Sequence, residues 1–437
     1  MDPQSQIDPE IVLTAAKDGD PRAQVQVAVQ ALRRGDEGEF RHWIQQAASQ
    51  DFPPALFRLG SWRLSQVLSP TDLTEAKDLI RRSAGLGFIN AVRAMVCLNA
   101  RGAGSLPDWS EALTWFKKAV QMNDPRAYRE AALLLADQAD NRALPKALLK
   151  HAGAAGDVLA CYHLGVMQKE SDNPEERQEA GFWLGHALQG GHPLAGKALQ
   201  SLKGVEVKGP GGELPRLQWP DVEERLSAVS EPLEADDGEE VLADPQARRI
   251  KNVLEPWECD YLIGRAQPRL KPATTSESLD QGQEASDYRT NSAAKFWLLQ
   301  QDLVINRIDR KIALASEAPV DFCEDLVALN YKPGERYYPH CDAFLPELPE
   351  QAAEIDLKGQ RVRTCLVYLN DDFKAGETHF LFPDAKIRCE VGEALIFENV
   401  TEEGDPDQHA VHEGLPVTSG EKWLASKWIR DKSQVLF

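Results

Sequence analysis

The sequence predicts a multidomain α + β protein with a stack of helix pairs in its N-terminal half and a domain of short strands in its C-terminal half. A short phrase recurs through residues 8–202 at intervals of 32–36 residues, a repeat length typical of stacked helix pairs. Residues 203–244 are rich first in Gly and Pro and then in acidic residues, which predicts a linker. From 245 to 437, short strand-forming runs alternate with turn residues. We therefore expect an α-solenoid, a linker and a strand domain within these limits.

The recurring phrase has two fixed points. It ends at an alanine, whose small side chain permits close packing where the next helix begins: Ala23, Ala55, Ala91, Ala127, Ala160 and Ala195. Four residues earlier stands a residue type that accepts the left-handed conformation ending a helix: Gly19, Asp51, Gly87, Asn123, Gly156 and Gly191. The phrase therefore predicts where one helix of each pair ends and the next begins.

A large apolar residue lies eight positions before five of these helix ends, where it would face the core: Trp43, Leu79, Trp115, Leu148 and Trp183. With period, stop residue and anchor together, this half resembles the Sel-one-like repeats, relatives of the tetratricopeptide family, although some units lack the usual Gly or Trp. The resemblance implies an α-solenoid whose concave face binds proteins or peptides. A helical bundle without a partner is the alternative.

Composition restricts the partners. The formal net charge is −20, so we expect no binding to nucleic acid or to an anionic membrane, which need Lys and Arg. No apolar run approaches the roughly 20 residues of a membrane span, and the acidic N-terminus does not resemble a secretory signal. None of the seven cysteines forms a Cys-x-x-Cys pair, which indicates reduced thiols and a cytoplasmic protein.

Residues 221–229, 256–265 and 295–315 are expected to form helices in the C-terminal half. Short strands are expected at 326–332, 362–369, 378–382, 394–398 and 423–430. Short strands at such spacing indicate a sandwich or a jelly roll.

The candidate chemistry begins at His340-Cys341-Asp342. In an extended strand, residues two apart point to one face, so His340 and Asp342 would project together. One imidazole and one carboxylate, joined by a distant second imidazole, form the facial triad of non-haem iron oxygenases. The spacing leaves both His409 and His412 open as the third ligand, and a surface strand with two polar residues is the alternative.

Several motifs around this pair form an ordered set, at residues 331–342, 361–371, 376–380, 412–423 and 427–430. With them, residues 245–431 resemble the prolyl-4-hydroxylase branch of the iron(II)/2-oxoglutarate dioxygenases. The resemblance implies a double-stranded β-helix (jelly roll) with flanking helices. It also implies Fe(II) held by His340, Asp342 and His412, and it selects His412 over His409 because the family's third ligand precedes Gly-x-Pro-Val.

The resemblance further implies 2-oxoglutarate and O2 as cosubstrates and raises ascorbate as an additional reductant. Lys422 would pair with the distal carboxylate of 2-oxoglutarate, and Tyr331 would hydrogen-bond the same carboxylate. Thr378 and Tyr368 match positions that line the cosubstrate pocket. The residues themselves agree for the lysine, because strand alternation puts Lys422 and Lys427 on opposite faces and a lysine pointing inward needs an anion.

Three departures from the family pattern stand near the site. Ala375 replaces the first glycine of Gly-Gly-Glu-Thr, and Asn291 replaces the serine of Arg-Thr-Ser, which puts the substrate in doubt. His379 is unusual, and we interpret it as structural or as a support for the ligands. Because Asp342 is present, the aliphatic halogenase chemistry that needs this position free is disfavoured.

We expect hydroxylation of a protein or peptide, most simply at proline, with the solenoid recruiting the substrate. Acidic residues crowd 347–356 and 402–407, which favours a basic polypeptide, although solubility alone would also explain them. One alternative is a scaffold, or an oxygen or 2-oxoglutarate sensor, with vestigial catalysis; the intact triad and Lys422 argue against it. Another alternative is a hydroxylase of a free amino acid or small metabolite, against which the solenoid argues.

Overall fold

The computed structural model describes residues 8–66, 70–103, 107–136, 142–227, 238–273 and 288–434 of the 437-residue chain. The described residues divide into two compact units, one up to residue 127 and one from residue 128 to 434. Within the described residues, no helix combines the length and the apolar character needed to cross a bilayer.

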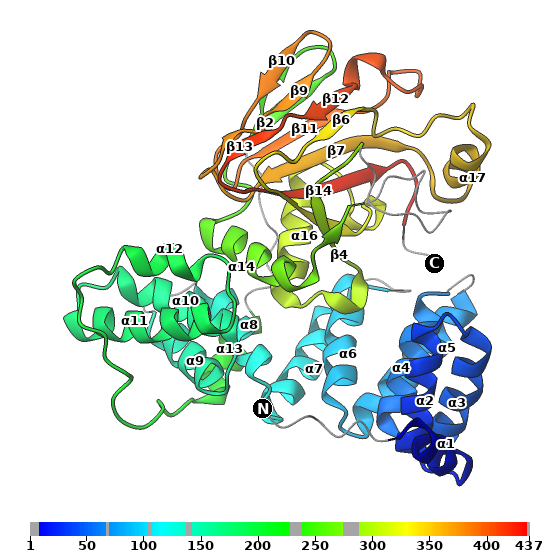
Figure 1. Ribbon diagram of the computed structural model, residues 1–437, viewed down its shortest axis with the longest axis vertical. Helices are drawn as coiled ribbons and strands as arrows, with labels where there is room; N and C mark the ends of the chain where they lie inside the picture. Colours follow the sequence, from blue (N-terminus) through cyan, green and yellow to red (C-terminus); the bar gives the residue numbers. More distant parts are fainter. Residues whose placement is uncertain are drawn as a thin grey trace. The chain divides into compact units, whose positions relative to one another are not determined.

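The first unit consists of helices, each packed against the next one in the chain (Figure 1). These are α1 (Pro9–Lys17), α2 (Pro21–Arg33), α3 (Glu37–Ser49), α4 (Pro53–Leu64), α5 (Pro70–Gly85), α6 (Ile89–Arg101) and α7 (Trp109–Gln121). Helix α8 (Pro125–Ala136) crosses the boundary between the units. Short connections between neighbouring helices are the arrangement expected of helix-pair repeats.

The helix ends follow the predicted pattern. All six predicted stop residues have a positive φ, from 54° at Asp51 to 97° at Gly19. All six recurring alanines are at most 7% exposed, and in α2, α4, α6, α8 and α10 (Val158–Lys169) the alanine is the third residue of the helix. The stop residue and the alanine therefore fix each helix–helix corner, as the sequence predicts.

The apolar anchors follow the prediction only in part. Trp43, Leu148 and Trp183 are buried, whereas Leu79 and Trp115 are half-buried. In those two helices the next residue, Ile80 or Phe116, is the fully buried one. A step of one residue turns a helix by 100°, so the core-facing line there lies one position beyond the predicted anchor.

The second unit begins with the last repeats: α9 (Ala143–Ala154), α10, α11 (Pro174–Gln189), α12 (Ala195–Gln200) and then α13 (Trp219–Ser227). Among them, α10 packs directly on α14 (Pro256–Ala266) of the strand domain. The hydroxyl of Tyr162 donates to a carboxylate oxygen of Asp260 at 2.7 Å. A Cβ on Gly264 would come within 2.5 Å of a side-chain carbon of Leu159, so the Leu159 side chain lies directly against the backbone of α14. The second compact unit therefore includes residues on both sides of the predicted domain limits at 202 and 245. The division into a repeat domain, a linker and a strand domain remains a prediction.

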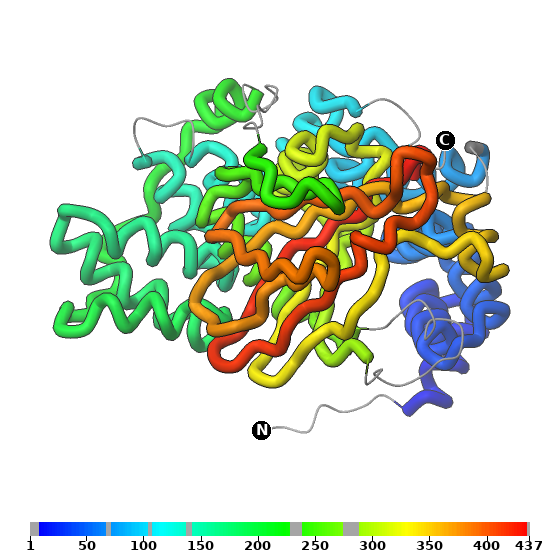
Figure 2. The backbone as a smooth tube through the Cα atoms, turned by 90° about the horizontal axis from the view of Figure 1, so that it is seen from above, coloured from blue at the N-terminus to red at the C-terminus, as the bar shows by residue number. Residues whose placement is uncertain are grey.

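The strand domain contains two main antiparallel sheets and a two-stranded sheet (Figures 1 and 2). The eight-stranded sheet has the order β1-β2-β11-β7-β14-β5-β4-β3, the four-stranded sheet β10-β9-β12-β6, and the small sheet pairs β13 with β8. The larger sheet contains β1 (Glu239–Leu242), β2 (Ala247–Ile250), β3 (Lys271–Pro272), β4 (Ser292–Phe296), β5 (Leu326–Tyr331), β7 (Arg361–Tyr368), β11 (Ala394–Glu398) and β14 (Lys422–Arg430). The smaller sheets contain β6 (Tyr337–His340), β8 (Lys374–Ala375), β9 (Thr378–Phe380), β10 (Ala385–Ile387), β12 (His412–Gly414) and β13 (Val417–Ser419).

An apolar core of residues from both main sheets includes Tyr331, Tyr368, Phe380 and Phe397. The predicted strand at 394–398 is observed with the same limits, and the other four predicted strands differ by one or two residues at their ends. The fold class, helical repeats followed by a jelly roll with flanking helices, is confirmed.

Two predicted elements differ in the structure. The helix expected at 295–315 begins only at α16 (Leu303–Ala315), because Asp302 caps it by accepting a hydrogen bond from the Ile305 N–H at 2.9 Å. Of the expected helix, residues 295–296 instead end β4, which pairs with β5, and Leu298–Gln300 form a short 3-10 helix. The linker expected at 203–244 contains strand β1, which pairs with β2 at its end, while residues 228–237 lie outside the described part.

Strand β14 has buried side chains on both faces. Lys422 and Lys427 lie on opposite faces, as strand alternation predicts. The face that carries Lys427 is covered, because this lysine forms a fully buried ion pair with Asp309 of α16. The other face, with Lys422, is turned to the core between the sheets.

Candidate metal and cosubstrate site

Three potential metal ligands meet at one point on the inner face of the smaller sheet. His340 ends β6 and His412 begins β12, and the two residues are direct cross-strand partners. Asp342 follows two residues after β6. One ligand atom from each of the three side chains lies within 4.8 Å of the others. The Nε2 of His340 lies 3.7 Å from Asp342 Oδ1, and the Nε2 of His412 lies 3.8 Å from Asp342 Oδ2.

The orientation of both imidazoles is set by the backbone. His340 Nδ1 lies 2.8 Å from the carbonyl oxygen of Tyr338, and His412 Nδ1 lies 3.0 Å from that of Ala410. A carbonyl oxygen only accepts, so each Nδ1 carries a proton, and each Nε2 is the ring nitrogen near Asp342. Two imidazole nitrogens and a carboxylate that converge on one point are ligands for a divalent cation. The donor set therefore fits Fe(II).

The protonation states agree with this fit. Burial lowers the pKa of His340 to about 3, and the neighbouring His412 lowers it further. Burial alone would raise the pKa of Asp342. The imidazoles of His412 and His340, with Arg361 and the Thr364 hydroxyl, outweigh burial and hold that pKa at about 2. Near neutral pH the site thus presents a neutral His340 and an ionised Asp342.

The Asp342 carboxylate has its own support. The hydroxyl of Thr364, in β7, donates to Asp342 Oδ2 at 2.7 Å, and Asn399 Nδ2 donates to that hydroxyl at 2.9 Å. All three residues are buried. One oxygen of the carboxylate is therefore fixed from the larger sheet, on the side away from the solvent.

His409, the competing third ligand, lies outside this cluster. It is exposed, and its Nδ1 lies 2.6 Å from Asp244 Oδ2. With Asp407 these two residues form a second group of ligand-type atoms at the surface. The structure thus brings His412, and not His409, to His340 and Asp342.

A pocket of about 400 Å³, including space open to solvent, contains the three candidate ligands. Tyr331 and Thr378 also line it. Its remaining lining is mixed: Arg289, Leu329, Tyr337, Leu366, Glu413, Gly414, Leu424, Ser426 and Trp428.

Lys422 lies behind this lining and is 2% exposed. Its Nζ donates to the carbonyl oxygen of Gly376 at 2.6 Å and lies 5.4 Å and 5.2 Å from the ring centres of Tyr331 and Tyr368. Among the ion pairs of the described residues, none involves this lysine. Burial lowers its pKa to about 7, with Glu377 acting in the opposite direction. A buried lysine without a carboxylate partner is the arrangement that an anionic ligand completes.

Tyr331 and Tyr368 differ in what they offer. Tyr331 faces Lys422 across the β5–β14 pair, and it lines the pocket. The hydroxyl of Tyr368 is already engaged, because it donates to the carbonyl oxygen of Ile387 at 3.2 Å and lies 3.1 Å from Thr378 Oγ1. Tyr368 therefore supports Thr378 from behind, while Thr378 and Tyr331 reach the pocket.

Sequence reasoning missed several residues of the site. Tyr337 stacks on His340, with ring centres 3.6 Å apart, although residues three apart do not share a face in a regular strand. A register shift between His412 and Gly414 breaks that regularity. Thr364 lies within the motif at residues 361–371, but no sequence signal indicates a role for it at Asp342.

His379 supports the outer face of the smaller sheet, in keeping with the structural interpretation. Its Nδ1 lies 3.0 Å from Glu413 Oε1 and its Nε2 lies 2.7 Å from Asp384 Oδ1. Burial alone would lower the pKa of His379, but these two carboxylates raise it.

Comparisons with known proteins agree with this geometry. A family model described as the 2OG-Fe(II) oxygenase superfamily matches residues 326–430. Prolyl 4-hydroxylase 1 of Arabidopsis thaliana is 34% identical over 205 residues, which cover 43% of this chain and 70% of that protein. Prolyl 4-hydroxylase 13 of the same plant is 33% identical over 208 residues, covering 44% of this chain and 73% of that protein.

Among solved structures, a viral collagen prolyl hydroxylase from Paramecium Bursaria Chlorella virus-1 is 27% identical, with 42% of this chain and 95% of that chain covered and a TM-score of 0.32. A Sel1 repeat protein from Oxalobacter formigenes is 21% identical, with 45% and 89% covered and a TM-score of 0.36. The repeat architecture itself rests on the helix pairs and corners described above.

The chain belongs to the prolyl 4-hydroxylase family within the 2OG-Fe(II) oxygenase superfamily. It is a 2-oxoglutarate-dependent dioxygenase with an N-terminal repeat domain, which confirms the resemblance drawn from its motifs. Fe(II), 2-oxoglutarate and O2 are the metal and cosubstrates that this family implies.

Proposed function

We propose that this protein hydroxylates a protein or peptide substrate at proline. In this proposal His340, Asp342 and His412 hold Fe(II), while Lys422 and Tyr331 hold the distal carboxylate of 2-oxoglutarate, and Thr378, backed by Tyr368, lines the cosubstrate pocket. The relatives named prolyl 4-hydroxylase support the choice of proline. The observation that carries the proposal is the buried Lys422, which lacks a carboxylate partner and lies behind the pocket that contains the three ligands.

The chemistry supplied by bound Fe(II) with O2 and 2-oxoglutarate is the conversion of a substrate C–H to C–OH, coupled to the oxidation of 2-oxoglutarate to succinate and CO2. The protein contributes orientation. The carbonyl oxygens of Tyr338 and Ala410 keep both Nε2 atoms aimed at one point, and Thr364 fixes the carboxylate of Asp342.

In this proposal, Lys422 and Tyr331 also select the cosubstrate. An ammonium group buried in an apolar wall favours an acid that delivers a carboxylate to it over one that is too short to do so. Leu329, Leu366 and Leu424 supply an apolar part of the pocket lining. Exclusion of water there strengthens the attraction between the lysine and the bound carboxylate.

The proposal includes a basic polypeptide as the substrate, recruited by the repeats. Glu347, Glu350 and Asp356 are exposed, and Glu402, Glu403 and Asp405 are exposed before His412. Glu354, in contrast, forms ion pairs with Arg430 and Lys358. Turnover of proline peptides flanked by Lys should exceed that of neutral peptides and fall with added salt. Equal, salt-independent turnover would contradict the basic preference.

Ascorbate as a reductant and a cytoplasmic location also belong to this proposal. The seven cysteines are all free thiols, which supports a reducing compartment. Ascorbate dependence is tested by comparing the number of turnovers with and without it.

The central experiment uses the full chain with Fe(II), 2-oxoglutarate and proteins from cells that lack the enzyme. Mass spectrometry should find one added oxygen on proline in specific proteins, together with succinate production. The His340→Ala variant should do neither. If wild type and His340→Ala give equal amounts of succinate with every peptide and protein tried, the hydroxylase proposal is wrong. Zero-length cross-linking of a captured substrate should mark residues within 8–202 if the repeats recruit it.

A further inference from the structure

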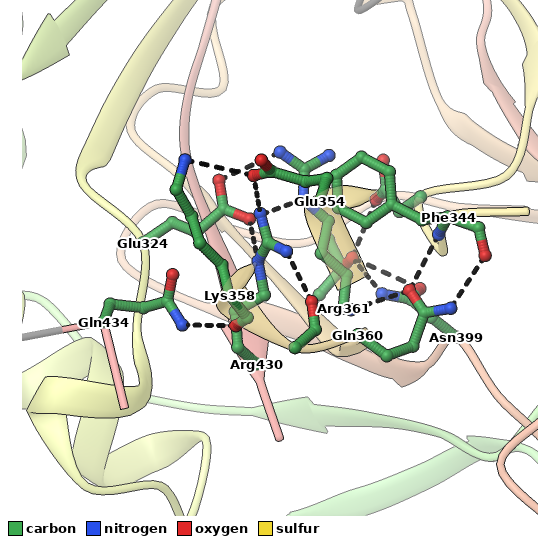
Figure 3. Close-up of polar contacts among 12 residues, drawn as sticks. Glu324, Phe344, Glu354, Lys358, Gln360, Arg361, Asn399, Arg430 and Gln434 are labelled. Atoms are coloured by element: carbon green, nitrogen blue, oxygen red, sulfur yellow. Dashed lines mark hydrogen bonds and ion pairs between the residues drawn. The ribbon is translucent and has the colours of Figure 1, made fainter. Parts of the chain in front are cut away.

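A second set of contacts holds the main chain immediately after Asp342. The amide side chain of Gln360, which is 7% exposed, binds both backbone groups of Phe344. Its Nε2 donates to the Phe344 carbonyl oxygen at 2.7 Å, and its Oε1 accepts from the Phe344 N–H at 2.8 Å. The same oxygen accepts from the Arg361 N–H at 2.8 Å. The Gln360 side chain thus holds both the N–H and the carbonyl oxygen of Phe344, two residues after the candidate ligand Asp342 (Figure 3).

The ring of Phe344 is held as firmly as its backbone. The guanidinium carbons of Arg361 and Arg430 lie 4.8 Å and 4.7 Å from its ring centre. Both arginines are themselves fixed by Glu324, Arg361 through two hydrogen bonds of 2.6 Å and 2.9 Å and Arg430 through one of 2.6 Å. Figure 3 shows this network around Phe344. Paired arginines over an aromatic ring leave the ring little freedom to move.

Gln360 is itself anchored to the end of β14. Its N–H donates to Asp431 Oδ1 at 2.8 Å, and its carbonyl oxygen accepts from the Asp431 N–H at 3.1 Å. The preceding Gly359 has φ +83°, and a Cβ there would lie 2.1 Å from the same Asp431 oxygen. Only glycine, which has no Cβ, accepts both this positive φ and this close approach of Asp431. The amide is therefore placed by rigid neighbours and not by a flexible loop.

These contacts and Thr364 fix Asp342 from one strand. Thr364, in β7, binds the carboxylate, and Gln360, just before β7, binds the main chain two residues further on. Only Ala343, which is buried, separates Asp342 from Phe344 along the chain. A shift of Phe344 would therefore be transmitted to the position of the Asp342 carboxylate.

We propose that Gln360 is a positioning residue for the metal site: by clamping Phe344 it sets where the Asp342 carboxylate meets His340 and His412. The inference rests on the proposed function of those three residues. Gln360 touches no ligand atom and acts only through Phe344. Removal of a group hydrogen-bonded directly to a metal ligand typically changes metal affinity by about 10- to 100-fold, and Gln360, one step further from the ligand, is expected at the lower end of that range.

The test uses Co(II) bound to the full chain, since its visible absorption reports ligand geometry without turnover. Gln360→Ala should weaken Co(II) binding at least about ten-fold and change the absorption bands. The matched control is Gln301→Ala, which removes another buried glutamine that donates to a backbone oxygen, that of Phe296, in the same unit. This control should keep wild-type affinity and spectrum, even where it lowers the melting temperature as much.

Gln360→Glu tests the same clamp if the alanine variant does not fold. A carboxylate keeps the two bonds accepted from backbone N–H groups and loses the bond donated to the Phe344 carbonyl oxygen. It should give a smaller loss of affinity with a changed spectrum. A Gln360 variant that folds and matches Gln301→Ala in affinity and spectrum would overturn the positioning role. The proposed metal site itself fails separately, if wild type binds no Co(II) or if Asp342→Ala binds it as wild type does.

Discussion

The buried Lys422 makes the affinity for 2-oxoglutarate depend on pH in a defined window. Burial holds the pKa of this lysine at about 7 in the free protein. Only the protonated lysine attracts a carboxylate, and 2-oxoglutarate, with two carboxylic acids, is fully ionised well below this range. As pH rises through 7, the free protein loses the proton that the bound complex needs. Binding therefore takes up a proton, and affinity falls with rising pH.

The size of the effect follows from the fraction of protonated lysine. With a pKa of about 7, that fraction is about 0.9 at pH 6, about 0.1 at pH 8 and about 0.01 at pH 9. The dissociation constant should therefore rise about ten-fold between pH 6 and 8 and about ten-fold again by pH 9. The bound complex keeps its proton across this range, because the carboxylate raises the pKa of the lysine that it contacts.

The assay is titration calorimetry of 2-oxoglutarate into the Mn(II)-loaded full chain without oxygen. Measurement in buffers of different ionisation enthalpy counts the protons taken up at each pH. Lys422→Arg is the matched control, because an arginine stays charged and removes the pH dependence due to this position while sharing every other titrating group. A wild-type affinity that stays flat from pH 6 to 9, or that follows the arginine variant, would refute the reasoning.

Three further predictions concern stability and ligand choice. Ala375 has φ +57°, so Ala375→Gly should raise the free energy of unfolding by up to about 1 kcal/mol in urea titrations, whereas Gly376→Ala, whose Cβ would lie 2.9 Å from a neighbouring side chain, should lower it. Lys427→Met should lower the free energy of unfolding by about 3–5 kcal/mol, because it leaves Asp309 buried without its cation. Adding Asp309→Leu to this variant should restore most of the loss. A double variant as unstable as Lys427→Met alone would contradict this. His409→Ala should keep the Co(II) spectrum of wild type, and loss of that spectrum would show that the third ligand is misassigned.

Local sequence signals were enough to place the corners of the repeats. A residue that tolerates positive φ and an alanine four positions later are both short-range requirements, so Gly19 and Ala23 can be recognised without knowing the rest of the fold. The anchors at Leu79 and Trp115 were less well placed, because which side of a helix is buried depends on its neighbours. The same limit applies to α16, whose start is set by the Asp302 cap and by the pairing of β4.

The candidate ligands could be predicted from the sequence, but their supports could not. His340 and Asp342 stand close together in one motif, and family resemblance supplied His412. The bonds that fix Asp342 come from Thr364, 22 residues further along the chain, and indirectly from Asn399, 35 residues beyond Thr364. Only the jelly roll brings those positions together. Contacts of this kind follow from strand register, which turn lengths and bulges decide and which no local pattern encodes.

The two proposals act at opposite ends of one strand. Lys422 begins β14 and faces Tyr331 across the β5 pair, while Asp431, directly after its end, anchors Gln360. Among the described residues the two ends share no side-chain partner, so their effects should be additive. A Gln360→Ala protein should keep the wild-type slope of 2-oxoglutarate affinity against pH, and Lys422→Arg should keep the wild-type Co(II) spectrum. Coupling between them in the double variant would mean that β14 moves as one body, and that the metal ligands and the cosubstrate anchor cannot be adjusted independently.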